Sequence, residues 1–388
     1  MQLNLNNLEW LHGSVKTLGE RPVVPFAEEV IEELDALSKA LMKDPLSRQY
    51  PDVVTFAFFC RRGNLLKLKE QYASAAIRLG WGTVFHIAPS NVPVNFAYSV
   101  VAGLLAGNTN VVRVSQKQFP QVDIIVKHMR ETHMHRVAVV RYPHESNANE
   151  VFSSLCNVRV IWGGDATIET IRKNAIPARA FDICFADRYS IAAIRPKAIL
   201  EADNCSLIAE RFYNDTYLFD QNACSAPHLV CWEKSDGLDD AKKRFWDAVY
   251  DYAKAHYQFQ DVMAVDKLTA LYKQAVAMPT HDEETKDNVL RRVEIESLPC
   301  DIDSFRCAGG YFTECEVESL DDIAPIVSPK YQTLAYYGFE REELEAFVQR
   351  NHLTGIDRIV PFGETTAFSL TWDGRDLIQA MSRIIDVK

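Results

Sequence analysis

Between residues 82 and 174 the chain alternates short apolar segments, rich in β-branched residues, with segments of helical periodicity. The apolar segments predict strands over 82–88, 110–114, 138–140 and 158–162. The periodic segments predict helices over 96–106, 121–130, 150–155 and 166–174. Strands that alternate with helices form a parallel sheet with right-handed crossovers. We therefore expect an α/β fold with a doubly wound, Rossmann-type sheet.

The pattern continues on both sides of this region. Two helices are expected before it, over 22–48 and 65–79. After Pro177, strands are expected over 182–186, 190–194, 358–361 and 384–387, and helices over 205–219, 237–257, 268–278 and 376–381. An acidic loop is expected over 280–287, and 321–335 with 340–349 complete a second α/β unit. No internal repeat or linker is evident, so we expect one body with two lobes.

Composition excludes several classes of protein. The length of 388 residues is enough for two or three domains, and the net charge of -11 argues against nucleic-acid and anionic-membrane partners. The first ten residues lack the features of a signal peptide, and apolar runs such as 92–105 are too short for a membrane span. The nine cysteines are scattered without a CxxC pair, which favours reduced thiols in a cytoplasmic protein without a metal site.

Cys224 lies in the sequence FDQNACSAPH, a polar and turn-prone stretch between a predicted helix and an apolar strand. Free backbone N–H groups and a nearby imidazole, here His228, favour the thiolate form of a cysteine. Cys224 is therefore a candidate nucleophile, and His228 a candidate to activate the thiol or to protonate a leaving group. The alternatives are a cysteine buried as a small apolar residue and a structural histidine at the start of a strand.

Three further positions follow predicted strands of the first sheet, where ligands bind in doubly wound folds. Gly163, Gly164 and Asp165 form a glycine-containing turn that opens a helix, which suits a diphosphate; an ordinary turn with Asp165 as N-cap is the alternative. Asn91 lies in a turn, and its amide can donate to an oxyanion; a simple turn residue is the alternative.

Arg113, Ser115 and Lys117 follow the strand NVVRV. Two cations and a hydroxyl suit a phosphorylated adenosine ribose, whereas an acidic residue, which favours an unphosphorylated ribose, is absent between Arg113 and Pro120. These residues predict NADPH rather than NADH as the cofactor. A solvated basic turn is the alternative.

Four segments together resemble the aldehyde dehydrogenase superfamily. They are HIAPSNVPVNFAYSVVAGLLAGNTNVVRVS, IWGGDATIETI, DQNACSAPH and PFGETTAFSLTWDGRDLIQAMSRIIDVK, and they occur in the order of that superfamily from about residue 82 to 388. The wording YPDVVTFAFFCRRGNL, DQNACS and WDGRDLI is most similar to the acyl-CoA reductases of the bacterial bioluminescence fatty-acid reductase complex.

The resemblance implies roles for individual residues. Cys224 would be the nucleophile, with Asn91 and the Cys224 N–H as the oxyanion hole. Gly163, Gly164, Asp165 and Ile168 would lie along the cofactor, with Arg113 beside its adenosine ribose. The family also has an acidic residue that binds a ribose of the cofactor, and its counterpart here is expected near 321–325.

The resemblance also implies the domain organisation of a homo-oligomer. A cofactor-binding domain would cover 1–188, completed by about 352–375. A catalytic domain would cover 189–351, and a C-terminal helix with an oligomerisation strand would cover 376–388.

One departure from the hydrolytic aldehyde dehydrogenases indicates the reaction. Their general-base glutamate is absent from the matching stretch 187–193, and a thioacyl-enzyme without such a base is not readily hydrolysed. We therefore expect NADPH-dependent reduction of an acyl thioester, such as acyl-CoA, to the aldehyde. Three acyl donors stay open: coenzyme A, a carrier protein and a partner enzyme. One alternative is oxidation of an aldehyde, with Glu201 or Glu210 activating water; another is a non-catalytic acyl-binding subunit.

Overall fold

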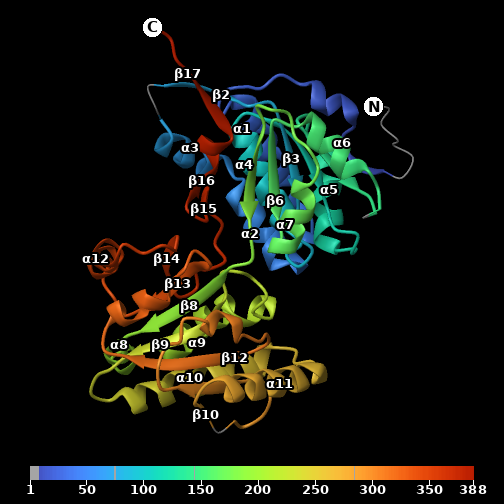
Figure 1. Ribbon diagram of the computed structural model, residues 1–388. Coiled ribbons are helices and arrows are strands. Elements are labelled where there is room, and N and C mark those ends of the chain that lie inside the picture. Colours follow the sequence, from blue (N-terminus) through green and yellow to red (C-terminus); the bar gives the residue numbers. More distant parts are fainter. Residues whose placement is uncertain (1–7, 74–75, 144, 284) are drawn as a thin grey trace. The chain divides into compact units, whose positions relative to one another are not determined.

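The computed structural model describes residues 8–73, 76–143, 145–283 and 285–388. The chain forms two compact units (Figure 1): unit 1 comprises Met1–Ala186 with Phe368–Lys388, and unit 2 comprises Asp187–Ala367. The sequence assigned 352–375 to the first lobe. That assignment is wrong for 352–367, because strand β14 (Arg358–Pro361) pairs with a strand of unit 2.

Unit 1 is organised around a six-stranded sheet in the order β1-β5-β4-β3-β6-β7. Its strands are β1 (Glu9–His12), β3 (Thr83–Ile87), β4 (Thr109–Arg113), β5 (Val137–Arg141), β6 (Val158–Trp162) and β7 (Phe181–Phe185). Strand β1 is antiparallel to β5, and the other neighbours are parallel. From β3 the chain winds first to β4 and β5 and then back to β6 and β7. The order therefore reverses between β3 and β6, which is the topological switch point of a doubly wound sheet.

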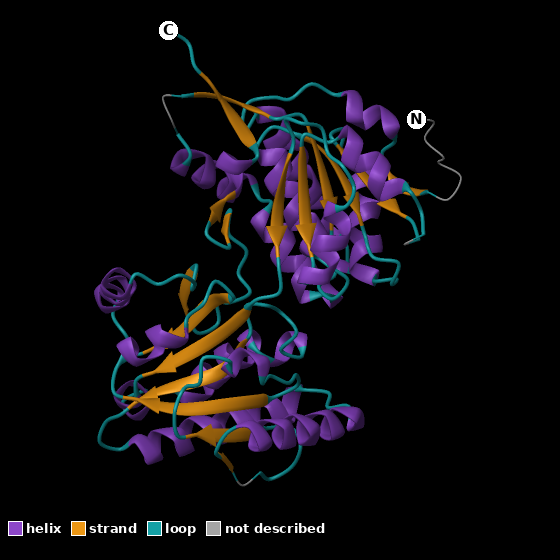
Figure 2. Ribbon diagram, viewed as in Figure 1, coloured by secondary structure: helices purple, strands orange, loops and turns teal. Residues whose placement is uncertain are grey.

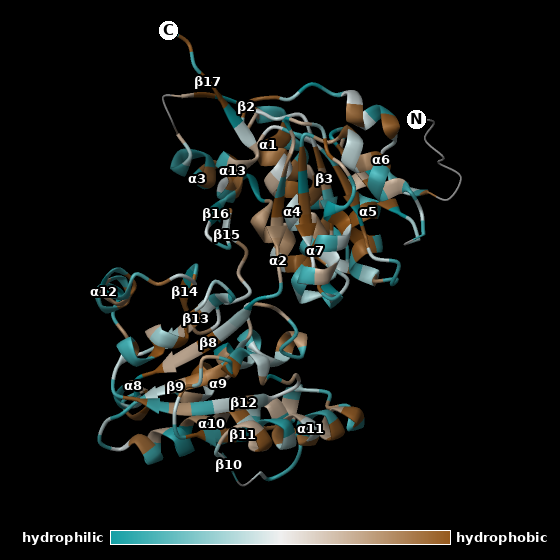
Figure 3. Cartoon of the chain, viewed as in Figure 1, coloured by the Kyte–Doolittle hydropathy of each residue, from teal (hydrophilic) through white to brown (hydrophobic). Residues whose placement is uncertain are grey.

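Helices cover both faces of this sheet (Figure 2). The consecutive residues Val84 and Phe85 of β3 belong to the cores on opposite faces, because side chains alternate between the two faces along a strand. The core of one face includes residues of α1 (Glu28–Lys43), α2 (Pro51–Phe59), α4 (Asn95–Leu105) and α5 (Pro120–Glu131). The core of the other face includes residues of α6 (Ala148–Leu155) and α7 (Asp165–Arg172). The apolar colour of the strands around β3 in Figure 3 follows from this burial on both faces.

The segment 65–79 differs from the sequence prediction of one helix. It contains the end of α3 (Arg62–Gln71) and the strand β2 (Ile77–Gly80), while positions 74 and 75 lie outside the described residues. Strand β2 pairs antiparallel with the last strand, β17 (Ser382–Ile385). This pairing depends on residues about 300 positions away in the chain, so local periodicity does not reveal it. Two 3-10 helices, η1 (Val15–Gly19) and η2 (Ser47–Gln49), complete this part of the unit.

The C-terminal segment of unit 1 returns to the first core. Phe368 stacks on Tyr98 with ring centroids 4.6 Å apart. A hairpin of β15 (Thr371–Trp372) and β16 (Arg375–Asp376) is followed by α13 (Leu377–Ala380) and β17. The predicted terminal strand is therefore present, and it pairs within unit 1.

Unit 2 contains a seven-stranded sheet in the order β10-β11-β12-β9-β8-β13-β14. Its strands, besides β14, are β8 (Tyr189–Ile194), β9 (Pro227–Glu233), β10 (Thr280–Asp282), β11 (Arg291–Ile295), β12 (Tyr311–Val317) and β13 (Tyr331–Tyr337). Only β10 is antiparallel to its neighbour. Strand β10 lies where the sequence predicted an acidic loop over 280–287, of which position 284 lies outside the described residues.

Two cores enclose the sheet of unit 2. The first includes residues of α8 (Pro196–Leu200), α9 (Cys205–Asp215), η3 (Tyr217–Phe219) and α10 (Leu238–His256). The second includes residues of η4 (Ile302–Ser304), η5 (Leu320–Ile326) and α12 (Arg341–Asn351). Helix α11 (Asp261–Ala277) packs on β11 and β12 through Leu271. Across the described parts of the chain, no helix combines the length and the apolar character that a membrane crossing requires.

A buried chain of polar side chains links the strands at the switch point of unit 1. The Asn110 amide nitrogen donates to Asn108 O, so its Oδ1 accepts from His86 Nε2 at 2.9 Å. Nε2 therefore carries the proton, and His86 Nδ1 accepts from the Ser99 hydroxyl at 2.7 Å. Trp162 Nε1 donates to the same hydroxyl at 2.9 Å. Burial lowers the pKa of His86 to about 4, so the ring stays neutral.

This neutral histidine predicts a pH dependence of stability. Its folded-state pKa lies below the unfolded value of 6.5, so between pH 4 and 6.5 the unfolded chain binds more protons. The free energy of unfolding should therefore fall as the pH is lowered, by about 2 kcal/mol from this group between pH 6.5 and 5. Urea titrations followed by tryptophan fluorescence would measure it. His86→Gln should show a smaller fall in the free energy of unfolding than the wild type, whereas the exposed control His281→Gln should show the same fall as the wild type. Equal falls in all three proteins would contradict the prediction.

Candidate functional site

The loops that follow β3 and β6 lie at the switch point of unit 1. Parallel strands end at the same edge of the sheet, so the turn that contains Asn91 and the turn at Gly163-Gly164-Asp165 are at the same carboxyl edge. Asn91 is exposed there. The sequence-predicted ligand residues of unit 1 therefore gather at the edge where ligands of doubly wound folds bind.

Helix α7 begins at this edge with Gly164 as its N-cap, so Asp165 is the first helical residue and not the N-cap. No side chain caps this helix end. A Cβ added to Gly164 would meet no atom within 4 Å, so the space beside this residue is open. An uncapped helix start with this space suits an anionic group. Ile168, in contrast, is 5% exposed and packs in the core beneath α7, so it does not face this space.

The basic turn after β4 has a different arrangement from the one that the sequence indicated. Arg113 is buried, and its guanidinium lies over the ring of Tyr142 at 5.0 Å from the centroid. The Ser115 hydroxyl accepts from the Lys117 N–H at 3.1 Å, which fixes the turn and leaves the Lys117 side chain exposed. Arg141, at the end of β5, donates from Nε to Ser115 O at 3.2 Å. Arg141 was not among the predicted ligand residues, although it ends the neighbouring strand with a cation as Arg113 does.

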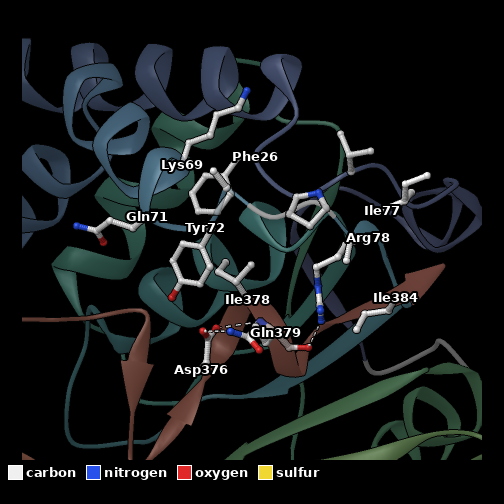
Figure 4. A pocket seen from close by; sticks show the side chains of 14 residues that line it. Phe26, Lys69, Gln71, Tyr72, Ile77, Arg78, Asp376, Ile378, Gln379 and Ile384 are labelled. Atoms are coloured by element: carbon white, nitrogen blue, oxygen red, sulfur yellow. Dashed lines mark hydrogen bonds between the residues drawn. The ribbon is translucent and has the colours of Figure 1, made fainter. Parts of the chain in front are cut away.

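A pocket of about 930 Å³ opens elsewhere in unit 1, beside β2 and β17. Figure 4 shows Phe26 and Tyr72 stacked on one side, and Arg78 reaching Gln379 on the other. Strand β2 ends at Gly80, which packs so closely on Gly107 O that an added Cβ would overlap it. Gly107 precedes β4, so this pocket lies toward the amino edge of the sheet. It is therefore separate from the carboxyl edge that carries the ligand turns.

Cys224 lies in unit 2 in a turn from Ala223 to Ala226, closed by a bond from Ala226 N to Ala223 O at 2.9 Å. The turn precedes β9, so Cys224 is at the amino edge of the second sheet. Its side chain is half-buried and is not part of a disulfide. The Ser190 hydroxyl of β8 donates to Cys224 O at 2.6 Å and fixes the turn to the sheet.

Gln221 holds the same turn from the upstream side. It is 2% exposed and has a positive φ of 56°. Its Oε1 accepts from Gly310 N at 2.6 Å and from Tyr311 N at 3.1 Å. Its Nε2 donates to the carbonyl oxygens of Pro227 and Tyr311, each at 3.1 Å. All of the amide's contacts are with backbone groups, so this side chain joins the cysteine turn to β9 and β12. Gln221 was not among the site residues predicted from the sequence.

His228 is buried one residue inside β9. Its ring stacks on Tyr189 with centroids 5.8 Å apart, and Nδ1 has no hydrogen-bond partner among the described residues. Burial, followed by the charge of Arg306, lowers the pKa of His228 to about 3, so the imidazole is neutral at physiological pH. Protonation of this ring would place a charge in a buried site, which costs free energy. The catalytic role of His228 stays a prediction.

Three carboxylates bear on whether water could be activated at Cys224. Asp187, in the stretch where a general base was sought, accepts from Arg306 Nη2 at 2.6 Å. Glu201 follows α8 at the opposite, carboxyl edge of the second sheet and pairs with Lys197 at 3.7 Å. Glu210 on α9 hydrogen-bonds Tyr252 of α10. Glu201 is therefore remote from Cys224, and the carboxylate of Glu210 is engaged by Tyr252.

Two further expectations concern acidic residues and metals. Asp321 in η5 accepts from the Arg350 guanidinium at 2.7 and 2.9 Å, so this carboxylate is already paired. No group of three potential metal ligands occurs within residues 8–73, 76–143, 145–283 and 285–388. The turns described above place the predicted cofactor-binding residues at the carboxyl edge of the sheet in unit 1, and the candidate nucleophile in unit 2.

A doubly wound unit with a glycine turn at its switch point, together with a second α/β unit that presents a cysteine, defines the aldehyde dehydrogenase fold. Solved structures agree. The 1-pyrroline-5-carboxylate dehydrogenase of Thermus thermophilus matches with a TM-score of 0.69 and 13% identity, over 97% of this chain and 84% of that one. The NADP-dependent glyceraldehyde-3-phosphate dehydrogenase of Bacillus halodurans, solved with NADP, matches with a TM-score of 0.63 and 15% identity, over 94% and 86%.

Within this fold, the chain belongs to the acyl-CoA reductase (LuxC) family, whose model matches residues 34–384. The family resemblance seen in the sequence is confirmed. A long-chain acyl-protein thioester reductase of Vibrio harveyi is 23% identical over 325 residues. These cover 78% of this chain but 63% of that protein, so the chain spans less than two thirds of the length of this relative.

The contacts of Gln221 predict a large contribution to the stability of unit 2. Gln221→Leu keeps the size of the side chain, but it leaves two buried N–H groups and two carbonyl groups without their hydrogen-bond partner. The free energy of unfolding should fall by about 3 kcal/mol in chemical denaturation. The control Glu201→Gln alters one exposed ion pair and should change stability by about 0.5 kcal/mol or less. A Gln221→Leu protein as stable as this control would show that the amide does not hold the turn.

Proposed function

We propose that this protein reduces an acyl thioester to the aldehyde through a thioacyl-enzyme on Cys224. The observation that carries the proposal is a half-buried thiol in a turn fixed by Ser190 and Gln221, in a member of the acyl-CoA reductase family. The Vibrio harveyi relative is described as a long-chain acyl-protein thioester reductase, which supports a fatty acyl substrate.

The first half of the proposed reaction is acyl transfer. The Cys224 thiolate attacks the thioester carbonyl, a new C–S bond forms, and the bond to the donor sulfur breaks to release the donor thiol. The N–H of Cys224 and the amide of Asn91 are the predicted donors to the oxyanion. Both assignments stay predictions that the family resemblance implies.

The second half is reduction of the thioacyl group. When bound, a reduced nicotinamide supplies the hydride to the acyl carbon. Hydride addition leaves a hemithioacetal oxyanion on Cys224. The oxyanion then collapses, the C–S bond breaks, and the products are the aldehyde and the Cys224 thiolate. This step needs no proton from His228, whose ring is uncharged at neutral pH because burial lowers its pKa to about 3.

The surroundings of Cys224 support reduction rather than hydrolysis of the thioacyl group. Hydrolysis requires a base that activates water. Asp187 is engaged by Arg306, and Glu201 is at the far edge of the sheet. A thioacyl group that water does not attack can persist until hydride arrives. These contacts therefore favour thioester chemistry over oxidation of an aldehyde to the acid.

The cofactor that we propose is NADPH. The uncapped start of α7 and the open space at Gly164 fit a diphosphate at the carboxyl edge of unit 1. Lys117 is exposed beside Ser115, and Arg141 contacts the same turn, so the edge offers cations to a ribose phosphate. The buried position of Arg113 over Tyr142 makes Lys117 the stronger candidate for that contact.

The partners that we propose follow from the same chemistry. The acyl donor is acyl-CoA or another acyl thioester, or an acyl group transferred by a partner enzyme. The nine free thiols support a cytoplasmic location, where cysteines remain reduced. A homo-oligomer remains a proposal from the family resemblance.

The role of Cys224 can be tested with radiolabelled acyl-CoA. The wild type should retain label on the protein in the absence of NADPH and should oxidise NADPH when the thioester is added. Cys224→Ala should lose both properties, with a fall in rate of at least about 10³-fold. Cys205→Ala, in α9, is the matched control and should keep both. Persistent covalent label on Cys224→Ala would rule out this nucleophile, and aldehyde oxidation without thioester reduction would favour the alternative reaction.

The cofactor assignment can be tested with two variants at the carboxyl edge. Lys117→Ala should raise the KM for NADPH about tenfold and leave the KM for NADH nearly unchanged, because it removes one charge contact to the ribose phosphate. Gly164→Val should weaken both cofactors alike, because its side chain would occupy the space before α7. A wild-type preference for NADH, or equal effects of Lys117→Ala on both cofactors, would contradict NADPH specificity.

A further inference from the structure

Ser190 occupies an unusual place in the second sheet. It is fully buried, at 0% exposed, in the second position of β8. Its hydroxyl donates to Cys224 O at 2.6 Å and accepts from Thr333 N at 3.1 Å. A hydroxyl has one proton to donate, and here that proton goes to the backbone of the cysteine turn.

Both strands that neighbour Ser190 are irregular at this point. On one side, Ser190 pairs with Pro227 and Ile191 with Leu229, so His228 is an extra residue in β9. On the other side, β13 advances three residues, from Tyr331 to Leu334, while β8 advances two. Bulges are rare in parallel pairs and frequent beside active sites. The Ser190 hydroxyl lies between these irregularities and bonds to backbone on both sides.

The bond to Cys224 O fixes the orientation of one peptide group. The peptide unit is planar and trans, so the N–H of Ser225 points away from the carbonyl of Cys224. Holding that carbonyl against β8 directs the Ser225 N–H to the side opposite Ser190. It also limits rotation of the turn that carries the thiol. Gln221 fixes the turn upstream but does not contact the Cys224–Ser225 peptide.

We infer that Ser190 is a positioning residue of the cysteine site, whose hydroxyl fixes the Cys224–Ser225 peptide and thereby holds the thiol in its reactive orientation. The inference rests on the proposed function for its catalytic consequence. Its physical content, that the Ser190 hydroxyl controls the reactivity of the Cys224 thiol, does not depend on which substrate the enzyme uses.

The test measures the reactivity of Cys224 itself. Iodoacetamide is added to the full-length protein at one pH, and peptide mapping by mass spectrometry gives the alkylation rate at each cysteine. In Ser190→Ala the rate at Cys224 should fall about fivefold, the effect of losing one hydrogen bond of this kind. The rate at Cys300, which is exposed, should not change. Thioester-dependent kcat should fall by a similar factor with the KM for NADPH unchanged.

Two further variants make the result specific. Ser190→Cys keeps a weaker donor and should give a rate at Cys224 between those of the wild type and Ser190→Ala, which also provides a result if the alanine variant does not fold. Ser47→Ala removes another buried hydroxyl, one without a partner among the described residues, and should leave Cys224 unchanged.

Outcomes for the inference and for the proposed function are distinguishable. An unchanged or higher alkylation rate at Cys224 in both Ser190 variants would overturn the inference, as would parallel losses at Cys224 and Cys300. If the wild type reduces no thioester, the proposed function fails, yet the alkylation rates still decide the role of Ser190.

Discussion

Burial of a parallel sheet on both faces is the constraint on which this structure depends. Side chains on the two faces of each sheet belong to apolar cores, so residues that perform chemistry are confined to the ends of the strands. Unit 1 presents its glycine turn and its basic turn at a carboxyl edge. Unit 2 presents its cysteine at an amino edge, where the chain enters β9.

At the amino edge of the second sheet, hydrogen bonds satisfy the buried polar groups that position the cysteine turn. Gln221 satisfies four backbone groups, and the Ser190 hydroxyl joins Cys224 to Thr333. Buried polar groups stabilise a single conformation when every group is paired, and they destabilise it when one partner is lost. Such contacts define the turn more narrowly than apolar packing does, because hydrogen bonds are directional.

The same principle operates inside unit 1. The chain from Trp162 through Ser99 and His86 to Asn110 connects β6, α4, β3 and β4, and it runs from the carboxyl end of β6 to the amino half of β4. Trp162 immediately precedes Gly163 and stacks on Phe185 at 3.8 Å. The glycine turn therefore starts from a strand end that is fixed by a hydrogen bond and by a ring stack.

The sequence by itself determined the α/β class, the parallel strands of the first sheet and the position of Cys224 between a helix and a strand. Strands buried on both faces require continuous apolar runs, and helices require a period of 3.6, so both are visible locally. Tertiary structure decided that 77–80 and 280–282 are strands and that 352–367 belongs to unit 2, because these depend on pairing with distant segments. It also decided the roles of Ser190 and Gln221. Ser190 is one polar residue in an apolar strand, and its partners lie 34 and 143 positions away, where no local pattern can indicate them.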